Sequence, residues 1–141
     1  MTRFFMPAGE GVDEVSAWKK HAFDLKTICF APHVELAHEL AETFRRCGVP
    51  TFAIDAQTPQ RIYRQISALW WRDMLTMIVI TPETFAHRDG LGHAAECVID
   101  TKPTSKSMHR VMCAAMSLSK NGVYLDFAGN ILRHGFPEGM E

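Results

Sequence analysis

Basic side chains that stand close enough along the chain to contact phosphate occur in two groups. The groups are Arg61, Arg64 and Arg72, and then Lys102, Lys106 and Arg110. The second group spans a predicted helix start, where backbone N–H groups and the helix dipole favour anions. The same spacing is also typical of a solvated charged face, and both interpretations stay open. Arg72, Lys102, Lys106 and Arg110 are therefore candidate contacts for nucleic acid or for a protein partner.

A polar cluster in the middle of the chain is the second place where chemistry is conceivable. It contains His87, Arg88, Asp89 and His93, with a glycine on each side of Leu91. We expect it at the carboxyl end of a parallel strand, where open α/β sheets bind ligands. Its spacing matches no strong zinc pattern, so we predict no metal and no cofactor. Arg88 and Asp89 are candidate binding residues, and a solvated loop is the alternative.

Two consecutive tryptophans should have different environments. Trp70 continues the apolar stripe of Ile62 and Ile66 and is expected in the core. Trp71 precedes Arg72 and is expected at the surface, where tryptophan is typical of interfaces and can stack on bases. Trp71 is therefore a candidate partner contact, with ordinary packing as the alternative.

The elements that must position these residues alternate along the chain. Short apolar runs predict strands at 26–31, 50–54, 74–80, 97–99 and 122–126. Helical spacing of apolar residues predicts helices at 12–22, 34–47, 59–70 and 108–116, the third with Thr58 as its N-cap. This alternation predicts an α/β fold, a single domain with a mostly parallel sheet of about five strands and helices on both faces. We expect an irregular leader at 1–11, the domain at 12–136 and a flexible tail at 137–141.

Composition limits the classes of partner. The chain has 141 residues, 47% of them hydrophobic, and a formal net charge of −1. It lacks the overall positive field that gathers nucleic acid, although local patches stay possible. It shows neither a signal peptide nor a long apolar run, so we expect no membrane partner and a cytoplasmic location. The cysteines are expected to be buried reduced thiols; they are Cys29, Cys47, Cys97 and Cys113.

Three stretches of sequence carry a resemblance to a known family. They are Lys26 to Pro32, the run Gly48-Val49-Pro50-Thr51-Phe52-Ala53-Ile54-Asp55-Ala56-Gln57-Thr58-Pro59, and Leu125-Asp126-Phe127-Ala128-Gly129-Asn130-Ile131-Leu132-Arg133-His134-Gly135. Together they resemble the C-terminal lobe of superfamily 2 helicases of the DEAD/DEAH type from bacteria and phages. The resemblance covers about Val12 to Gly135, and the last stretch is its most specific part. It implies a RecA-like fold.

The chain departs from that family at the residues that act on ATP. It contains neither GxxxxGK[ST] nor DExx[HD], so the first lobe is absent from it. In the family's QxxGRxxR motif, the resemblance places Cys113 at the glycine and Ala114 and Ser117 at the two arginines; only Arg110, at the glutamine, is basic. An arginine finger contributes about 10³–10⁵ in rate in related NTPases. The spacing after Thr81 is also changed. The resemblance thus implies a protein that is not an enzyme.

The expected function is a non-catalytic, stand-alone interaction module. Its closeness to phage-type helicases suggests a phage or prophage protein that binds and blocks a helicase or a nucleic-acid-processing defence complex. The expected partner is then a protein, a helicase or a nucleoprotein complex. Two alternatives stay open: a nucleic-acid-binding accessory domain without ATPase activity, and one half of a split helicase. A homodimer that covers the unpaired face of the lobe is also possible.

Overall fold

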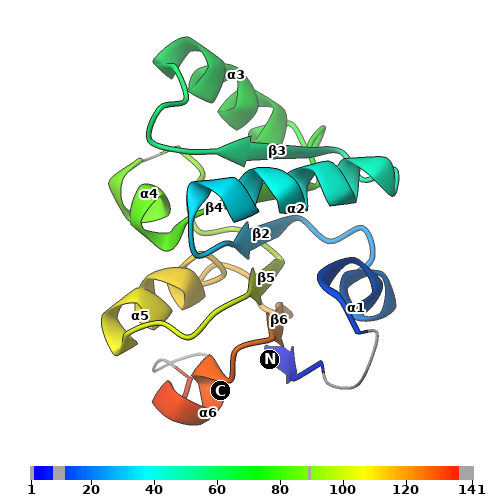
Figure 1. The fold of residues 1–141 in the computed structure, drawn as a ribbon, viewed down its shortest axis with the longest axis vertical. Coiled ribbons are helices and arrows are strands. Elements are labelled where there is room, and N and C mark those ends of the chain that lie inside the picture. The colour runs from blue at the N-terminus through cyan, green and yellow to red at the C-terminus, as the bar shows by residue number, and fades with distance from the viewer. Residues whose placement is uncertain (1, 8–11, 89, 137–141) are drawn as a thin grey trace.

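Six parallel strands form one sheet at the centre of the domain (Figure 1). The structure, a computed structural model, describes residues 2–7, 12–88 and 90–136. The strands are β1 (Arg3–Phe5), β2 (Thr27–Phe30), β3 (Thr51–Ile54), β4 (Met77–Ile80), β5 (Cys97–Asp100) and β6 (Val123–Asp126). Their order across the sheet is β1-β6-β5-β2-β4-β3, and every pairing is parallel.

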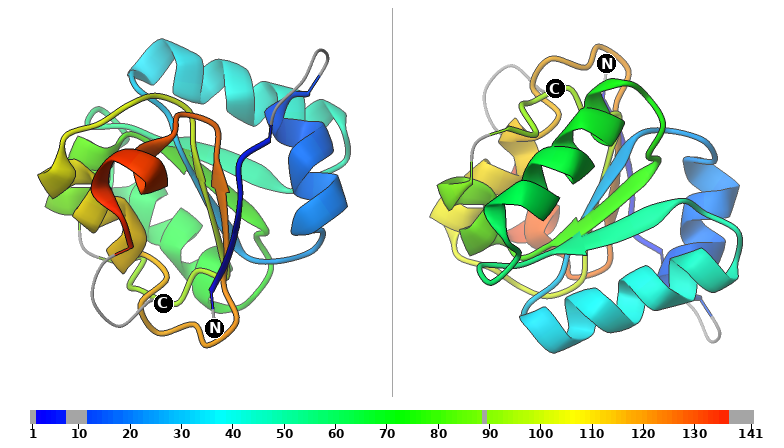
Figure 2. Two further views of the ribbon diagram at one scale, coloured as in Figure 1. Left: turned by 90° about the horizontal axis from the view of Figure 1, so that it is seen from below. Right: turned by 90° about the horizontal axis from the view of Figure 1, so that it is seen from above.

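Helices cover both faces of the sheet, as Figure 2 shows with α1 and α2 on one side and the other helices opposite them. The helices are α1 (Glu14–His21), α2 (Val34–Arg46), α3 (Gln60–Trp71), α4 (Pro82–His87), α5 (Lys106–Ala114) and α6 (Asn130–His134). Because both faces are covered, β2, β4, β5 and β6 are buried along their whole length. Such strands read as continuous apolar runs in the sequence.

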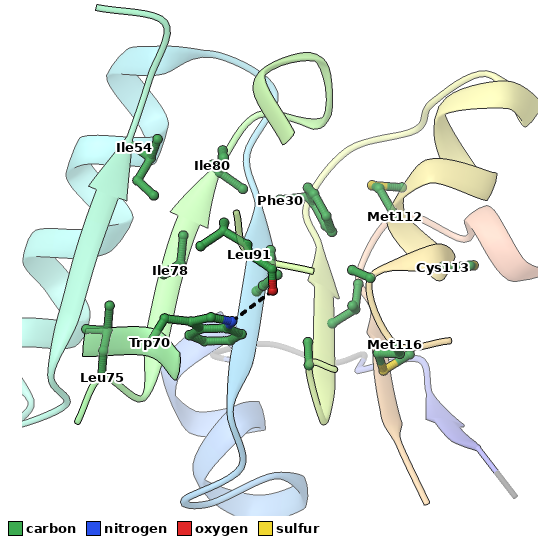
Figure 3. Close-up of a cluster of buried hydrophobic side chains, with 14 of the residues drawn as sticks. Phe30, Ile54, Trp70, Leu75, Ile78, Ile80, Leu91, Met112, Cys113 and Met116 are labelled. Carbon is green, nitrogen blue, oxygen red and sulfur yellow. Dashed lines mark hydrogen bonds between the residues drawn. The ribbon is translucent and has the colours of Figure 1, made fainter. Parts of the chain in front are cut away.

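Two apolar clusters, one on each face, make up the core. Successive side chains of a strand point to opposite faces, so Ile28 packs against the α3 side and Cys29 against the α1/α2 side. Trp70 is fully buried in the first cluster, and its indole Nε1 donates to the carbonyl oxygen of Leu91 at 3.1 Å (Figure 3). Trp18 is the matching residue of the second cluster, where its Nε1 donates to Thr27 Oγ1 at 2.8 Å.

The predicted fold class is confirmed, with six strands in place of about five. The additional strand, β1, lies in the segment predicted as an irregular leader, and its Arg3 and Phe5 pair with Val123 and Leu125 of β6. Pro7 and two nearby glycines favour an irregular segment. A strand of three residues can nevertheless form where it pairs with a neighbouring strand, here β6. Residues 8–11 and the tail at 137–141 lie outside the described part of the chain.

Two local predictions are wrong. Thr58 is not the N-cap of α3: its Oγ1 instead accepts the backbone N–H of Asp55 at 2.9 Å, and Pro59 occupies the cap position. Cys47 is exposed, unlike the other three cysteines, because it follows the last turn of α2 beyond the buried stripe. None of the described helices is both long enough and apolar enough to span a bilayer.

The core gives a direct test of this packing. Phe44 of α2 is fully buried and meets the Trp18 ring edge-on at a centroid distance of 6.1 Å. Phe44→Ala should lower the free energy of unfolding by about 3–5 kcal/mol, because the cavity adds to the lost burial. Urea unfolding followed by circular dichroism measures this. Phe23→Ala, at a ring that is 61% exposed, is the control and should change stability little; equal losses would contradict the packing of α2.

Candidate functional site

The order of the strands places a crevice at their carboxyl ends. The chain leaves β2 into α2 on one face, whereas it leaves the neighbouring β4 and β5 into α4 and α5 on the other face. Loops that diverge in this way open a crevice where α/β proteins commonly bind ligands. A cavity of about 280 Å³ lies there. It is lined by Phe30, Ala31, Pro32, Pro82, Glu83, Thr101, Lys102, Pro103, Thr104, Ser105, Met108 and Met112.

The second basic group lies beside this cavity. Lys102 lines it, Lys106 is the first residue of α5, and Arg110 follows one helical turn later. All three side chains are exposed. Residues four apart share a helix face, so Lys106 and Arg110 present two cations on one side of α5. The structure therefore places Lys102 at the carboxyl-edge cavity and Lys106 and Arg110 on the adjoining helix α5, and their contact with phosphate stays a prediction.

A second hollow, of about 410 Å³, lies between α4 and α5 at the segment that resembles the helicase arginine motif. Val111 and Ala114 line one side, and Ser117 is exposed just beyond α5. Arg88 is the only lysine or arginine among the described residues that line this hollow. Where the resemblance expects guanidinium groups, α5 therefore presents small or apolar side chains.

Arg88 is held against α3 rather than aimed into the open. Its Nη1 donates to the carbonyl oxygen of Asp55 at 3.0 Å, and its Nη2 donates to Gln60 Oε1 at 3.3 Å. Its guanidinium also lies over the Tyr63 ring, 4.5 Å from the centroid. These contacts engage both terminal nitrogens and stack the charge on an aromatic face. Arg88 is thus a structural tether between the loop after α4 and the start of α3.

The loop that follows Arg88 is fitted closely to α3. A Cβ on Gly90 would meet the Tyr63 hydroxyl at 3.0 Å, and one on Gly92 would meet the Trp71 ring at 2.8 Å. Both residues have positive φ, 136° and 67°, so glycine is needed for two reasons. The helix α4, which was not predicted from the sequence, stands between β4 and this loop, and His87 is its last residue. Asp89 lies outside the described residues.

Trp71 and Arg72 lie at the opposite edge of the sheet from the basic group. They end α3, just before β4 begins, whereas Lys102 follows the end of β5. Trp71 is 52% exposed and Trp70 is fully buried, as predicted from the sequence. Trp71 Nε1 also donates to the carbonyl oxygen of Gly90. The candidate residues therefore lie at two edges, the carboxyl edge and the amino edge, and the loop after α4 reaches Trp71 at the amino edge.

A buried polar network under α6 was not predicted from the sequence. Asp100 and Asp126, at the ends of adjacent strands, share a hydrogen bond between their carboxyl groups. Asp100 also accepts from the Tyr124 hydroxyl at 3.0 Å and from Asn130 Nδ2 at 2.8 Å. Asp126 accepts the N–H groups of Asn130 and Ile131, both at 2.9 Å, and so begins α6. The signal available in the sequence was an aspartate at the end of each of two predicted strands.

One of the two neighbouring carboxyl groups carries a proton and the other is ionised. Burial, together with the hydrogen bond and negative charge of Asp126, raises the pKa of Asp100 from 3.8 to about 7. Burial acts in the same direction on Asp126, but hydrogen bonds from Asp100 and from backbone N–H groups outweigh it and leave the pKa of Asp126 lowered. Asp100 is therefore the protonated partner, since two adjacent buried carboxylates cannot both ionise easily.

This arrangement predicts an unusual pH dependence of stability. Asp100 has a higher pKa folded than unfolded, so its contribution is complete below 3.8 and is lost as the pH rises towards about 7. Relative to Asp100→Asn, the free energy of unfolding of the wild type should fall across that interval. Chemical unfolding at a series of pH values measures the difference between the two proteins.

The comparison between variants cancels the titrations that do not depend on Asp100. Burial lowers the pKa of His109, so the neutral form of that ring adds stability that is lost on acidification, in the opposite direction. His109 is present in both proteins and largely cancels. Asp24→Asn, at an exposed carboxyl, is the matched control and should leave the profile unchanged. A wild-type profile parallel to that of Asp100→Asn would contradict the shared proton.

The fold has close counterparts among solved structures. The C-terminal part of the Fun30 ATPase domain has a TM-score of 0.67 at 11% identity, covering 79% of this chain and 38% of that chain. Domain 2 of the DEAD-box helicase Mss116p, bound to an RNA duplex, has a TM-score of 0.62 at 14% identity, covering 79% and 46%. The E. coli DEAD-box protein SrmB, bound to regulator of ribonuclease activity A, has a TM-score of 0.70 at 16% identity, covering 81% and 67%.

This chain spans less than half the length of the first two of these structures. No protein-family model matches the sequence, and no curated protein matches it. The shared feature is consequently the architecture: a parallel sheet with helices on both faces, aligned over about four fifths of the chain. The chain therefore has a RecA-like fold, which it shares with these proteins.

Proposed function

We propose that this domain is a non-catalytic interaction module that binds a protein complex which handles nucleic acid. In the specific form of this proposal, it is a cytoplasmic phage or prophage product that blocks a helicase or a nucleic-acid-processing defence complex. The fold supplies a helicase-like shape. The observation that carries the loss of catalysis is the hollow between α4 and α5, whose one described lysine or arginine, Arg88, is bound to α3.

Phosphoryl transfer depends on cations that meet the charge developing on the transferred phosphate. Ala114 and Ser117 bring no charge to the position that the resemblance gives to arginines. Turning Arg88 towards a phosphate would break its bonds to Asp55 and Gln60 and its stacking on Tyr63. The loop geometry therefore favours a structural role for Arg88. It supports a lobe that keeps the fold but does not catalyse phosphoryl transfer.

Two of the solved counterparts are bound to other molecules, Mss116p to an RNA duplex and SrmB to a protein. A lobe of this fold can thus offer either kind of surface. The formal net charge of −1 favours a protein partner for this chain, because nucleic acid is gathered by positive fields.

Capture from the native host tests this proposal. An affinity-tagged chain should retain a protein complex after thorough nuclease treatment, because the contact is made by protein. The captured helicase or nuclease should lose activity when the purified chain is added. The purified chain should hydrolyse no ATP above the buffer background. ATP hydrolysis by this chain, or retention that disappears with nuclease, would overturn the proposal.

A nucleic-acid-binding accessory domain is the second candidate, and the cations beside the carboxyl-edge cavity favour it. Lys102, Lys106 and Arg110 are exposed together, while Glu83 is the acidic residue among those that line the cavity. Phosphate contacts would displace counterions, and binding would then weaken steeply as salt increases.

Fluorescence anisotropy with labelled single- and double-stranded DNA and RNA across a salt series decides between the two candidates. If phosphate contacts exist, the double variant Lys106→Gln/Arg110→Gln should reduce the salt slope by about 1–2, roughly one for each cation removed. Lys20→Gln, at an exposed lysine of α1, is the control and should not change it. No binding at low salt would remove this candidate and leave the protein-binding module.

A further inference from the structure

Large apolar side chains gather at the amino edge of the sheet, opposite the carboxyl-edge cavity. Phe23, Trp71, Met74 and Leu118 are 61%, 52%, 65% and 72% exposed. They come from three segments: the turn after α1, the end of α3 with the turn that follows it, and the turn between α5 and β6. Exposed apolar side chains that converge in this way are typical of interaction surfaces, whereas scattered single ones need no explanation.

A polar hollow of about 500 Å³, which we name the amino-edge hollow, lies at the same edge of the sheet. Leu118 lines it directly, and Phe23 and Met74 are chain neighbours of the lining residues Asp24 and Asp73. Trp71 is linked to it through Lys26, whose Nζ lies 5.5 Å from the centroid of the Trp71 ring. We refer to these four apolar residues as the rim of the hollow, because Leu118 lines it and the other three adjoin lining residues.

The centre carries an excess of negative charge. Asp24, Asp73 and Glu96 line the amino-edge hollow, and Lys26 is the one cation among its described lining residues. Lys26 Nζ pairs with Asp73 at 3.2 Å, while Glu96 accepts the backbone N–H of Lys26 at 3.0 Å. Arg72 and Lys120 adjoin this region in sequence but are not among the described lining residues. Three carboxylates thus face one ammonium group.

The surface is held in place before any partner arrives. Asp24 and Asp73 have φ of 65° and 58°, and each sits in a tight turn next to an exposed apolar residue, Phe23 or Met74. The turn at Met74 is closed by its N–H, which donates to the carbonyl oxygen of Leu69 at 2.9 Å. Trp71 is fixed by its bond to Gly90 and by contact with Gly92. A fixed surface loses little conformational entropy on binding.

We infer that the amino edge is a docking surface for a protein segment that carries a lysine or arginine flanked by apolar side chains. The cation enters the amino-edge hollow and meets Asp24, Asp73 and Glu96, while the flanking side chains pack on the rim of Phe23, Trp71, Met74 and Leu118. Charge selects this occupant, because a nucleic acid would bring phosphates against carboxylates. The inference rests on the proposed function, for which it names the surface and the chemistry of the partner.

Selection from a displayed library of random short peptides tests the surface directly. Peptides enriched on the wild-type chain should contain a basic residue flanked by apolar residues. Their affinity, measured by anisotropy of labelled copies, should fall at least about tenfold for Met74→Gln/Leu118→Gln, a loss of about 1.4 kcal/mol or more. Leu132→Gln is the matched control, because Leu132 of α6 has the same 72% exposure as Leu118.

A charge variant tests the occupant separately. Asp24→Asn removes one carboxylate and keeps a residue type that tolerates positive φ, so the turn is preserved. It should weaken peptides that contain the basic residue and leave their uncharged analogues unchanged. No enrichment, enrichment of acidic peptides, or equal loss with Leu132→Gln would each overturn the inference.

Capture of a protein complex from the native host separates this inference from the proposed function. Met74→Gln/Leu118→Gln should lose that complex, and Leu132→Gln should keep it. A complex retained by all variants overturns the surface and leaves the proposed function standing. If even the wild type captures no complex, the proposed function fails, whereas the peptide selection still decides whether the surface binds.

Discussion

Burial of the parallel sheet on both faces is the constraint on which the remaining structure depends. Each central strand must supply apolar side chains to two cores, one under α1 and α2 and the other under α3 to α6. The chain can cover both faces only by changing sides, which it does between β2 and its neighbours. That change opens the carboxyl-edge cavity, and it leaves the amino edge to be closed by short turns. Both candidate surfaces therefore arise from the way in which the sheet is covered.

The buried polar groups help to hold the helices and loops that cover the sheet. Asp126 begins α6 by accepting two backbone N–H groups, and Asp100 joins it through a shared proton and through Asn130. Arg88 has a comparable role on the other side of α5, where it fastens the loop after α4 to the start of α3. In both places groups of a type common in active sites are engaged with the backbone and with neighbouring side chains. Asp100, Asp126 and Arg88 therefore make their hydrogen bonds within the domain.

The core elements were predictable from the sequence, whereas the places where polar residues meet were not. β2 to β6 are short apolar runs, and α1, α2, α3 and α5 show helical spacing, so local pattern and tertiary burial agree. β1 is too short to show a period, and α4 and α6, with six and five residues, are too short to show helical spacing. The split of the candidate residues between two edges follows from whether each residue precedes or follows a parallel strand. Strand order decides which of these residues become neighbours, and it depends on long-range pairing that no local pattern records.

The three tryptophans lie in different environments, so the intrinsic fluorescence of the domain reports on different parts of the structure. Trp18 and Trp70 are sealed in the two cores, while Trp71 has one side in solvent and lies near the Lys26 ammonium group. Emission from the first two follows the integrity of the two faces of the sheet. The third contributes the red-shifted, readily quenched part of the spectrum, and any molecule that covers the amino edge must shield it. Intrinsic fluorescence can thus distinguish loss of folding from occupation of a surface without an added label.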